Sequence, residues 1–149
     1  MAEVNSKQAA NKAANKRNRS ADYNPVRCLV ITTPDAWTAA DGDTMATGQK
    51  LPPEARPIGV KVGCAAGAAS STVSVGHRKL SDGSGAVAAS LGSQAINAAG
   101  TFDVDNGTLM ANGADAVTPD YEVEVFLTFG GANPTANQDL RIEVLFVAP

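Results

Sequence analysis

Residues 121–129 (YEVEVFLTF) and residues 140–147 (LRIEVLFV) alternate apolar and polar side chains almost without error. A period of two places every second side chain on one face of a β-strand, so each stretch predicts a half-buried strand. The ten residues between them, GGANPTANQD, are loop formers throughout, so we expect the two strands to form an antiparallel hairpin. The predicted core-facing side chains are Tyr121, Val123, Val125, Leu127 and Phe129 in the first strand and Leu140, Ile142, Val144 and Phe146 in the second.

Shorter strands are predicted in the first half of the chain. Residues 27–33 are rich in β-branched side chains and end at a proline, which favours a short strand. Residues 34–49 are predicted as a loop or weak strand. The prolines of residues 50–57 make that segment an extended entry rather than a central strand. The alternation that follows predicts one shared face, formed by Ile58, Val60, Val62 and Cys64.

Turn formers separate the remaining predicted strands, which are residues 72–77, 86–90, 94–98 and 108–111. Asp-Gly and Asn-Gly dipeptides between them favour the positive φ angles of tight turns. Roughly eight short strands thus follow one another, at spacings of about 8 to 15 residues and without helical periodicity between them. The expected fold class is all-β, an antiparallel β-sandwich or jelly-roll-like barrel.

The charges divide the chain into two parts. Residues 1–27 hold six lysines and arginines against two acids, a net charge of +4, which leaves −7 for the remainder of a chain whose total is −3. The sequence AANK occurs twice in succession at residues 9–16, but no large apolar side chain anchors it, and short isolated helices are marginal in water. We therefore expect residues 1–26 to form a basic, extended N-terminal arm and residues 27–149 a single β-sandwich domain.

A basic arm before an acidic body favours docking on an acidic surface, either nucleic acid or a neighbouring protein subunit. The body is poor in aromatic residues, so it offers neither a stacking platform nor a basic groove for nucleic acid. The arm alone would bind phosphate weakly and in a salt-sensitive way. These features favour a protein partner over nucleic acid. Neither a membrane-spanning apolar run nor a secretory signal is found in the sequence, and no membrane partner is expected.

The search for catalytic residues finds little. His77 is the single histidine, so a Ser-His-Asp or Cys-His scheme would have to use it, and its position in an apolar strand favours a structural role. Asp103, Asp105 and Asn106 lack the glycine position and the bidentate glutamate of a calcium-binding loop and are expected in a surface turn. We predict that the chain is not an enzyme and has no cofactor and no metal site.

Four other side chains have predicted structural roles. Cys28 and Cys64 each lie in an apolar stretch, where a buried thiol is expected in preference to a disulfide. Trp37 is expected to anchor a loop by packing rather than to form a ligand platform. Glu124 is expected on the outward side of its strand, where a charge provides solubility.

Several segments together carry a resemblance to a known group of proteins: residues 50–58 (KLPPEARPI), residues 72–76 (TVSVG), residues 107–109 (GTL), and the two closing strands with Pro134-Thr135-Ala136 between them. In these segments the chain resembles a group of small tailed-bacteriophage head proteins. The resemblance covers about residues 44–147. The resemblance implies a capsid decoration or cement protein, which binds the outside of an assembled icosahedral shell as a trimer or dimer and holds neighbouring capsomers together.

The resemblance also implies partners and a location. The major capsid protein would be the docking partner, the body would associate with itself as a homotrimer or homodimer, and the protein would lie on the outer capsid surface after synthesis in the host cytoplasm. We expect the arm to supply the docking cations, which are Lys7, Lys12, Lys16, Arg17 and Arg19. Two alternatives stay open: a head-fibre or tail-associated virion protein, and a carbohydrate-binding β-sandwich, which would need several exposed aromatic residues.

Overall fold

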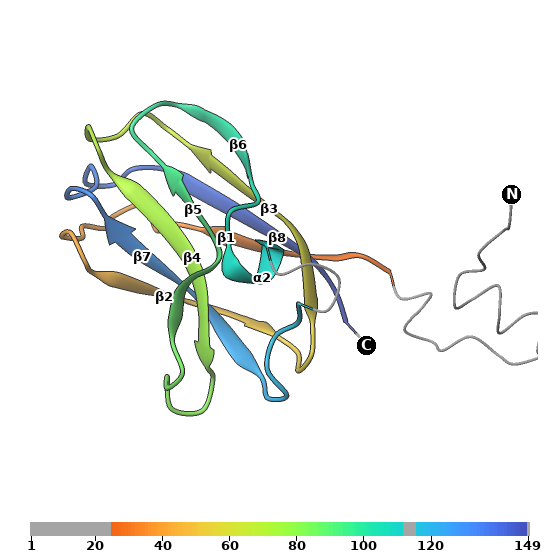
Figure 1. Cartoon of the computed structure of the whole chain (residues 1–149). Helices are drawn as coiled ribbons and strands as arrows, with labels where there is room; N and C mark the ends of the chain where they lie inside the picture. The colour runs from red at the N-terminus through yellow and green to blue at the C-terminus, as the bar shows by residue number, and fades with distance from the viewer. Residues whose placement is uncertain (1–24, 112–115, 149) are drawn as a thin grey trace, which may run out of the picture.

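The computed structural model describes residues 25–111 and 116–148 and is almost entirely β-structure (Figure 1). No helix in these two ranges is long and apolar enough to cross a membrane. The elements in chain order are β1 (Arg27–Thr32), β2 (Thr44–Leu51), β3 (Arg56–Cys64), β4 (Thr72–Lys79), β5 (Val87–Ala95), β6 (Gly100–Val104), the single helical turn α2 (Thr108–Ala111), β7 (Val123–Gly130) and β8 (Leu140–Val147).

The strands form two antiparallel four-stranded sheets packed face to face. Sheet A has the order β1-β8-β3-β6, and sheet B has the order β2-β7-β4-β5. In this arrangement the first strand pairs with the eighth, the second with the seventh, the third with the sixth and the fourth with the fifth. A long hairpin rolled up on itself gives this pairing, which is that of an eight-stranded jelly roll. The predicted fold class is confirmed.

The predicted hairpin of the two closing strands is wrong. β7 lies between β2 and β4 in sheet B, whereas β8 lies between β1 and β3 in sheet A (Figure 1). The connection at residues 131–139 therefore passes from one sheet to the other. Both strands have one apolar face in either arrangement, so the alternation that predicts each strand carries no information about its neighbours.

The inner faces of the two closing strands supply much of the core, as predicted. Val123, Val125, Leu127 and Phe129 are at most 1% exposed, and the four inward residues of β8 are at most 4% exposed. Tyr121 precedes β7 and is half-buried against the core. Each fully buried aliphatic or aromatic side chain contributes about 1.5 to 3 kcal/mol to folding, so these strands are a main source of stability.

Trp37 anchors the β1–β2 connection in the way predicted for it. Its ring stacks on Phe129 with the centroids 5.0 Å apart, and its Nε1 donates a hydrogen bond of 2.9 Å to the Gln138 carbonyl. Its backbone amide donates to Asn137 Oδ1 at 2.8 Å. The indole is only 8% exposed, so it has no free face on which a ligand could stack.

The outward face of β7 is partly covered by an ion pair between β7 and its neighbour β4. Glu124 points outward as predicted, and its Oε2 accepts a hydrogen bond of 2.8 Å from Arg78 Nε. The same guanidinium lies 5.1 Å from the centroid of the Phe126 ring, which leaves that outward aromatic only 3% exposed. A cation over an aromatic face adds an attraction of about 0.5 to 1 kcal/mol at partly exposed sites.

Backbone irregularities account for two differences from the strand predictions. Ile58 was expected on the face of Val60 and Val62, but it is 45% exposed, because the ladder between β3 and β8 shifts between Pro57 and Gly59. An extra residue in one strand shifts the alternation of side chains, so the odd and even positions exchange faces beyond it. β2, predicted as a loop or weak strand, forms eight residues of strand with its own shift between residues 46 and 50.

Three further boundaries differ from the sequence prediction. The two weak strands predicted at 86–90 and 94–98 are one strand, β5, which bends where its ladder with β4 shifts register. β6 occupies residues 100–104, for which no strand was predicted, and residues 108–111 form a helical turn instead of a strand. β6 is only five residues long and has a mixed composition, so its local pattern is too weak to identify it.

His77 is a buried residue of the inner face, and its predicted structural role agrees with this position. It is 6% exposed, and its Nδ1 lies 2.7 Å from the hydroxyl of Ser90, which is fully buried in β5. Burial lowers the pKa of His77 from its usual value near 6.5, because the charged imidazolium would lose its hydration. The imidazole is therefore neutral in the folded protein at pH 7.

The stability of the protein is expected to decrease as the pH falls below about 6.5. The unfolded chain takes up a proton there, while the folded chain does not until the lowered pKa of His77 is reached. The free energy of unfolding should fall by about 1 kcal/mol between pH values of about 7.5 and 5.5. Urea unfolding at both values measures it. Because His77 is the single histidine, His77→Gln should remove most of this slope, and an equal slope in the variant would contradict the assignment.

Candidate functional site

The connections between strands at one end of the sandwich contain acidic residues and no basic ones. The connections at that end are residues 33–43, 65–71, 96–99 and 131–139. Their charged side chains are Asp35, Asp41, Asp43 and Asp139. The described chain enters β1 at the opposite end of the sandwich, since β1 runs toward the connection at residues 33–43 (Figure 1). The acidic loop end and the attachment point of the basic arm are therefore separated by the length of the strands.

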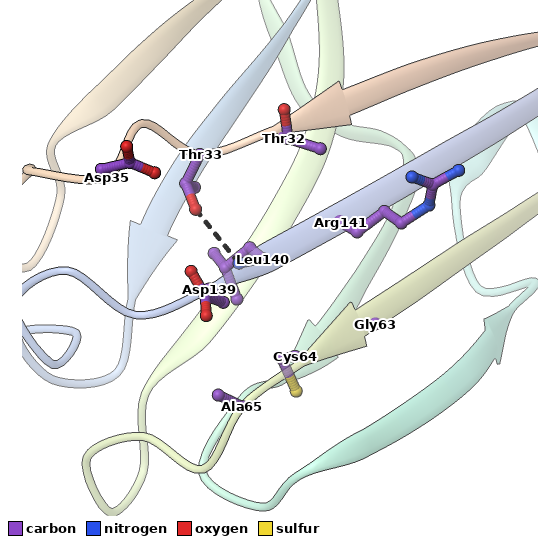
Figure 2. A pocket seen from close by; sticks show the side chains of 9 residues that line it. All are labelled: Thr32, Thr33, Asp35, Gly63, Cys64, Ala65, Asp139, Leu140 and Arg141. Atoms are coloured by element: carbon purple, nitrogen blue, oxygen red, sulfur yellow. Dashed lines mark hydrogen bonds between the residues drawn. The ribbon is translucent and has the colours of Figure 1, made fainter.

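A groove of about 460 Å³ opens at this acidic end, between the ends of β1, β8 and β3 (Figure 2). The Thr33 hydroxyl joins its walls, since it accepts a hydrogen bond of 3.1 Å from the Leu140 amide and donates one of 3.0 Å to the Gln138 carbonyl. Asp35 and Asp139 line the groove from two different loops. These hydrogen bonds hold the two loops together at the base of the residues that carry the carboxylates.

The electrostatics of the groove are set by its two aspartates. Arg141 also lines it, but its Nε is held by Glu143 Oε1 at 2.8 Å, and Figure 2 shows its guanidinium extending away from Asp139. Within the part of the chain that the structure describes, neither Asp35 nor Asp139 forms an ion pair. The groove can therefore accept ammonium or guanidinium groups from another protein.

The two cysteines differ from the expectation of buried thiols. Cys28 is exposed on the outer side of β1, and Cys64 is half-buried at the groove; both are free thiols. β1 is an edge strand whose even-numbered side chains face solvent, which is why the apolar stretch around Cys28 does not bury it. Burial raises the pKa of the Cys64 thiol, and its Sγ lies 3.2 Å from the Ala98 carbonyl, so this thiol stays protonated at neutral pH.

The acidic stretch at residues 103–106 is held by structural contacts. Asp103 lies 3.3 Å from Lys61 Nζ, across the β3–β6 ladder. Asn106 binds the backbone of β5 twice, since its Oδ1 accepts from the Ser93 amide at 2.9 Å and its Nδ2 donates to the Ser93 carbonyl at 3.0 Å. These contacts fasten the end of β6 to the edge of β5. No group of three or more potential metal ligands occurs among residues 25–111 and 116–148.

Replacing Asn106 with alanine is expected to lower the free energy of unfolding by about 1 kcal/mol. Both hydrogen bonds to Ser93 are lost, but they lie at an exposed position where water can replace them. Chemical denaturation measures the change. The exposed neighbour Asp105 provides the control, because Asp105→Ala should change stability by less than about 0.5 kcal/mol. Equal effects of the two substitutions would contradict a clamp at Asn106.

The predicted docking residues Lys7, Lys12, Lys16, Arg17 and Arg19 lie outside the described residues. The sequence analysis missed the pairing of Asp35 with Asp139 in one groove. The two residues are distant in the chain. Their loops meet because β8 lies beside β1, and this depends on the order of strands in sheet A. No local pattern signals such a site.

Comparisons with known proteins give a likeness in fold. No protein-family model matches the chain, and no curated protein matches it. Among solved structures, a chain of the "Capsid of Ralstonia phage GP4" is similar, with a TM-score of 0.65 over 84% of this chain and 85% of that chain. The sequence identity is 12%, so the likeness concerns the fold.

Proposed function

We propose that this protein is a structural component of a bacteriophage virion and serves as a decoration protein on the outside of the capsid. The observation that carries the proposal is the likeness in fold to a chain of a phage capsid, which extends over 84% of this chain. A jelly roll by itself hosts many functions, so the source of that neighbour is what favours the virion. The sequence resemblance to small phage head proteins, drawn from other features, leads to the same class.

The charges of the chain support a division of labour between arm and body. The cations at Lys7, Lys12, Lys16, Arg17 and Arg19 would pair with acidic residues of the major capsid protein. The described body has an acidic loop end, which like charges would keep away from the same acidic surface. In this arrangement the arm lies on the shell, the loop end points away from it, and the body bridges neighbouring capsomers.

The position of Trp37 argues against a carbohydrate-binding function. Sugar sites of this kind stack the ligand on exposed aromatic rings, but Trp37 is buried against Phe129, and Phe126 is covered by Arg78. Tyr121 is half-buried beside Lys79. A head-fibre or tail-associated role shares the same fold and differs in the number of copies on a particle.

Cosedimentation of the purified chain with assembled, undecorated capsids tests the proposal. We expect saturation at a copy number comparable with that of the major capsid protein, and binding that weakens as the salt concentration rises. Saturation at a few copies would instead indicate a fibre or tail component. A chain that stays in the supernatant at low salt would refute the virion assignment for these shells.

A further inference from the structure

β1 is an edge strand of sheet A whose open side no other described strand covers. It pairs with β8 on one side only, and its six residues, RCLVIT, contain no proline, no glycine and no register shift. An exposed, regular edge of this kind is a template for pairing with another strand, and proteins normally block it.

The other three edges of the sandwich are blocked. The edge strand β2 shifts register around Gly48, which has a φ of +68°, and its Thr47 hydroxyl turns inward to the Val125 carbonyl. The edge of β5 is clamped at Ser93 by Asn106. β6 is only five residues long and carries the charged Asp103. Among the described strands, β1 is therefore the edge left open.

The register shows which backbone groups of β1 are free. The Thr33 amide donates a hydrogen bond of 3.1 Å to the Leu140 carbonyl, so the odd-numbered residues of this strand turn their N–H and C=O groups toward β8. In an antiparallel ladder the alternate residues turn theirs the other way. Cys28, Val30 and Thr32 thus direct their backbone groups to the open side, where a groove of about 330 Å³ separates β1 from β2.

We propose that two copies of this chain associate through β1, as an antiparallel pair about a twofold axis at Val30. Val30 then lies opposite Val30 of the partner subunit, and Cys28 lies opposite Thr32 of the partner subunit. In this register each facing pair exchanges two backbone hydrogen bonds, and all the free groups of Cys28, Val30 and Thr32 are used. Sheet A becomes continuous across the dimer, and the contact closes on itself because it is isologous.

Charge complementarity supports a second copy of this chain as the partner of β1. Arg27 begins β1, Asp35 follows its end, and neither has an ion-pair partner among the described residues. Within one chain they are up to about 26 Å apart, since each of the residue steps between them advances an extended chain by about 3.3 Å. In the proposed register Arg27 lies opposite Thr33 of the partner subunit. Asp35 of the partner subunit follows two residues later, in the bend after β1, and comes within reach of the long Arg27 side chain. The symmetry creates this contact twice.

The inference goes beyond the proposed function, because it concerns the free protein and needs no capsid. Sedimentation velocity of the full chain over a range of concentrations tests it, with a concentration-dependent dimer as the expected result. Val30→Pro removes the N–H at the twofold axis without touching the β8 ladder and should weaken the dimer at least about thirtyfold. Val30→Thr keeps that N–H and the β-branched shape and should dimerise like the unaltered chain.

A charge exchange tests the register itself. R27E and D35K should each weaken the dimer about tenfold, because each places like charges side by side, and the double variant should restore it. Circular dichroism checks that every variant is folded. A chain that is monomeric at all concentrations would overturn the inference, as would a dimer indifferent to Val30→Pro or a double variant no better than the single ones. Capsid binding plays no part in these readouts, so their failure is distinct from failure of the proposed function.

Discussion

Deleting residues 1–20 is expected to leave a folded body that no longer stays on assembled shells. The deletion removes Lys7, Lys12, Lys16, Arg17 and Arg19, which are all the lysines and arginines before Arg27. The body that remains is acidic, and an acidic capsid surface would repel it. Since the proposed attachment relies on many modest contacts repeated over the shell, its loss should reduce the bound copies by at least about tenfold at moderate salt.

Cosedimentation with undecorated capsids measures this loss, and the far-ultraviolet circular dichroism of the deleted chain checks that the sheets remain. A matched control neutralises two body cations with Lys50→Gln and Arg56→Gln, which lie outside the arm and should keep most of the binding. A milder form of the test changes four arm cations, Lys12, Lys16, Arg17 and Arg19, to glutamine. Full shell binding by the deleted chain would contradict the division of labour between arm and body.

Gly76→Ala is expected to destabilise the fold by about 3 kcal/mol. Gly76 lies in β4 at the point where the first residues of β5 cross over it. A Cβ atom there would lie 2.2 Å from the Val87 carbonyl oxygen and 2.5 Å from that of Ala88. Both neighbours are backbone, so β5 would have to move away from β4 to make room, which also strains the nearby contact of His77 with Ser90.

Gly59 in β3 is the control for this effect. A Cβ atom at Gly59 would lie 3.6 Å from Leu145 Cδ1, which is ordinary contact with a flexible side chain. Gly59→Ala should change the free energy of unfolding by less than about 0.5 kcal/mol, because neither a clash nor a positive φ opposes it. Urea unfolding of the two variants measures the difference. Similar stabilities would mean that β5 does not pass over Gly76 as described.

The strand faces could be predicted from the sequence because they depend on local alternation. In β7 and β8 the period of two is unbroken, and every side chain predicted for their inner faces within the strand bounds is buried. The pattern failed at Ile58, where a single extra residue reverses the alternation. It also failed in β5, where a register shift interrupts the alternation and one strand was predicted as two weaker ones. Such irregularities are imposed by the partner strand and leave little trace in the sequence.

Strand order could not be predicted because it is a property of the whole sandwich. β7 and β8 are adjacent in the chain and joined by loop formers, which favours a hairpin, yet each is an inner strand of a different sheet. The rolled topology gives every inner strand two partners, and this non-local gain outweighs the local preference. The connection from β7 to β8, which passes from one sheet to the other, also places Asp139 in one groove with Asp35. The acidic site could therefore not be predicted from the sequence, for the same reason.

The central place of β8 in sheet A has a consequence for synthesis on the ribosome. β1 and β3 are translated early, but they do not pair with each other, because β8 lies between them. β3 can pair with β6 earlier, but sheet A cannot be completed, and β1 has no partner, until Leu140–Val147 has left the exit tunnel. Folding dominated by such distant pairings is slow. A nascent chain with this topology exposes unpaired, aggregation-prone strands for most of its translation. We therefore expect it to be a substrate of chaperones that bind emerging polypeptides.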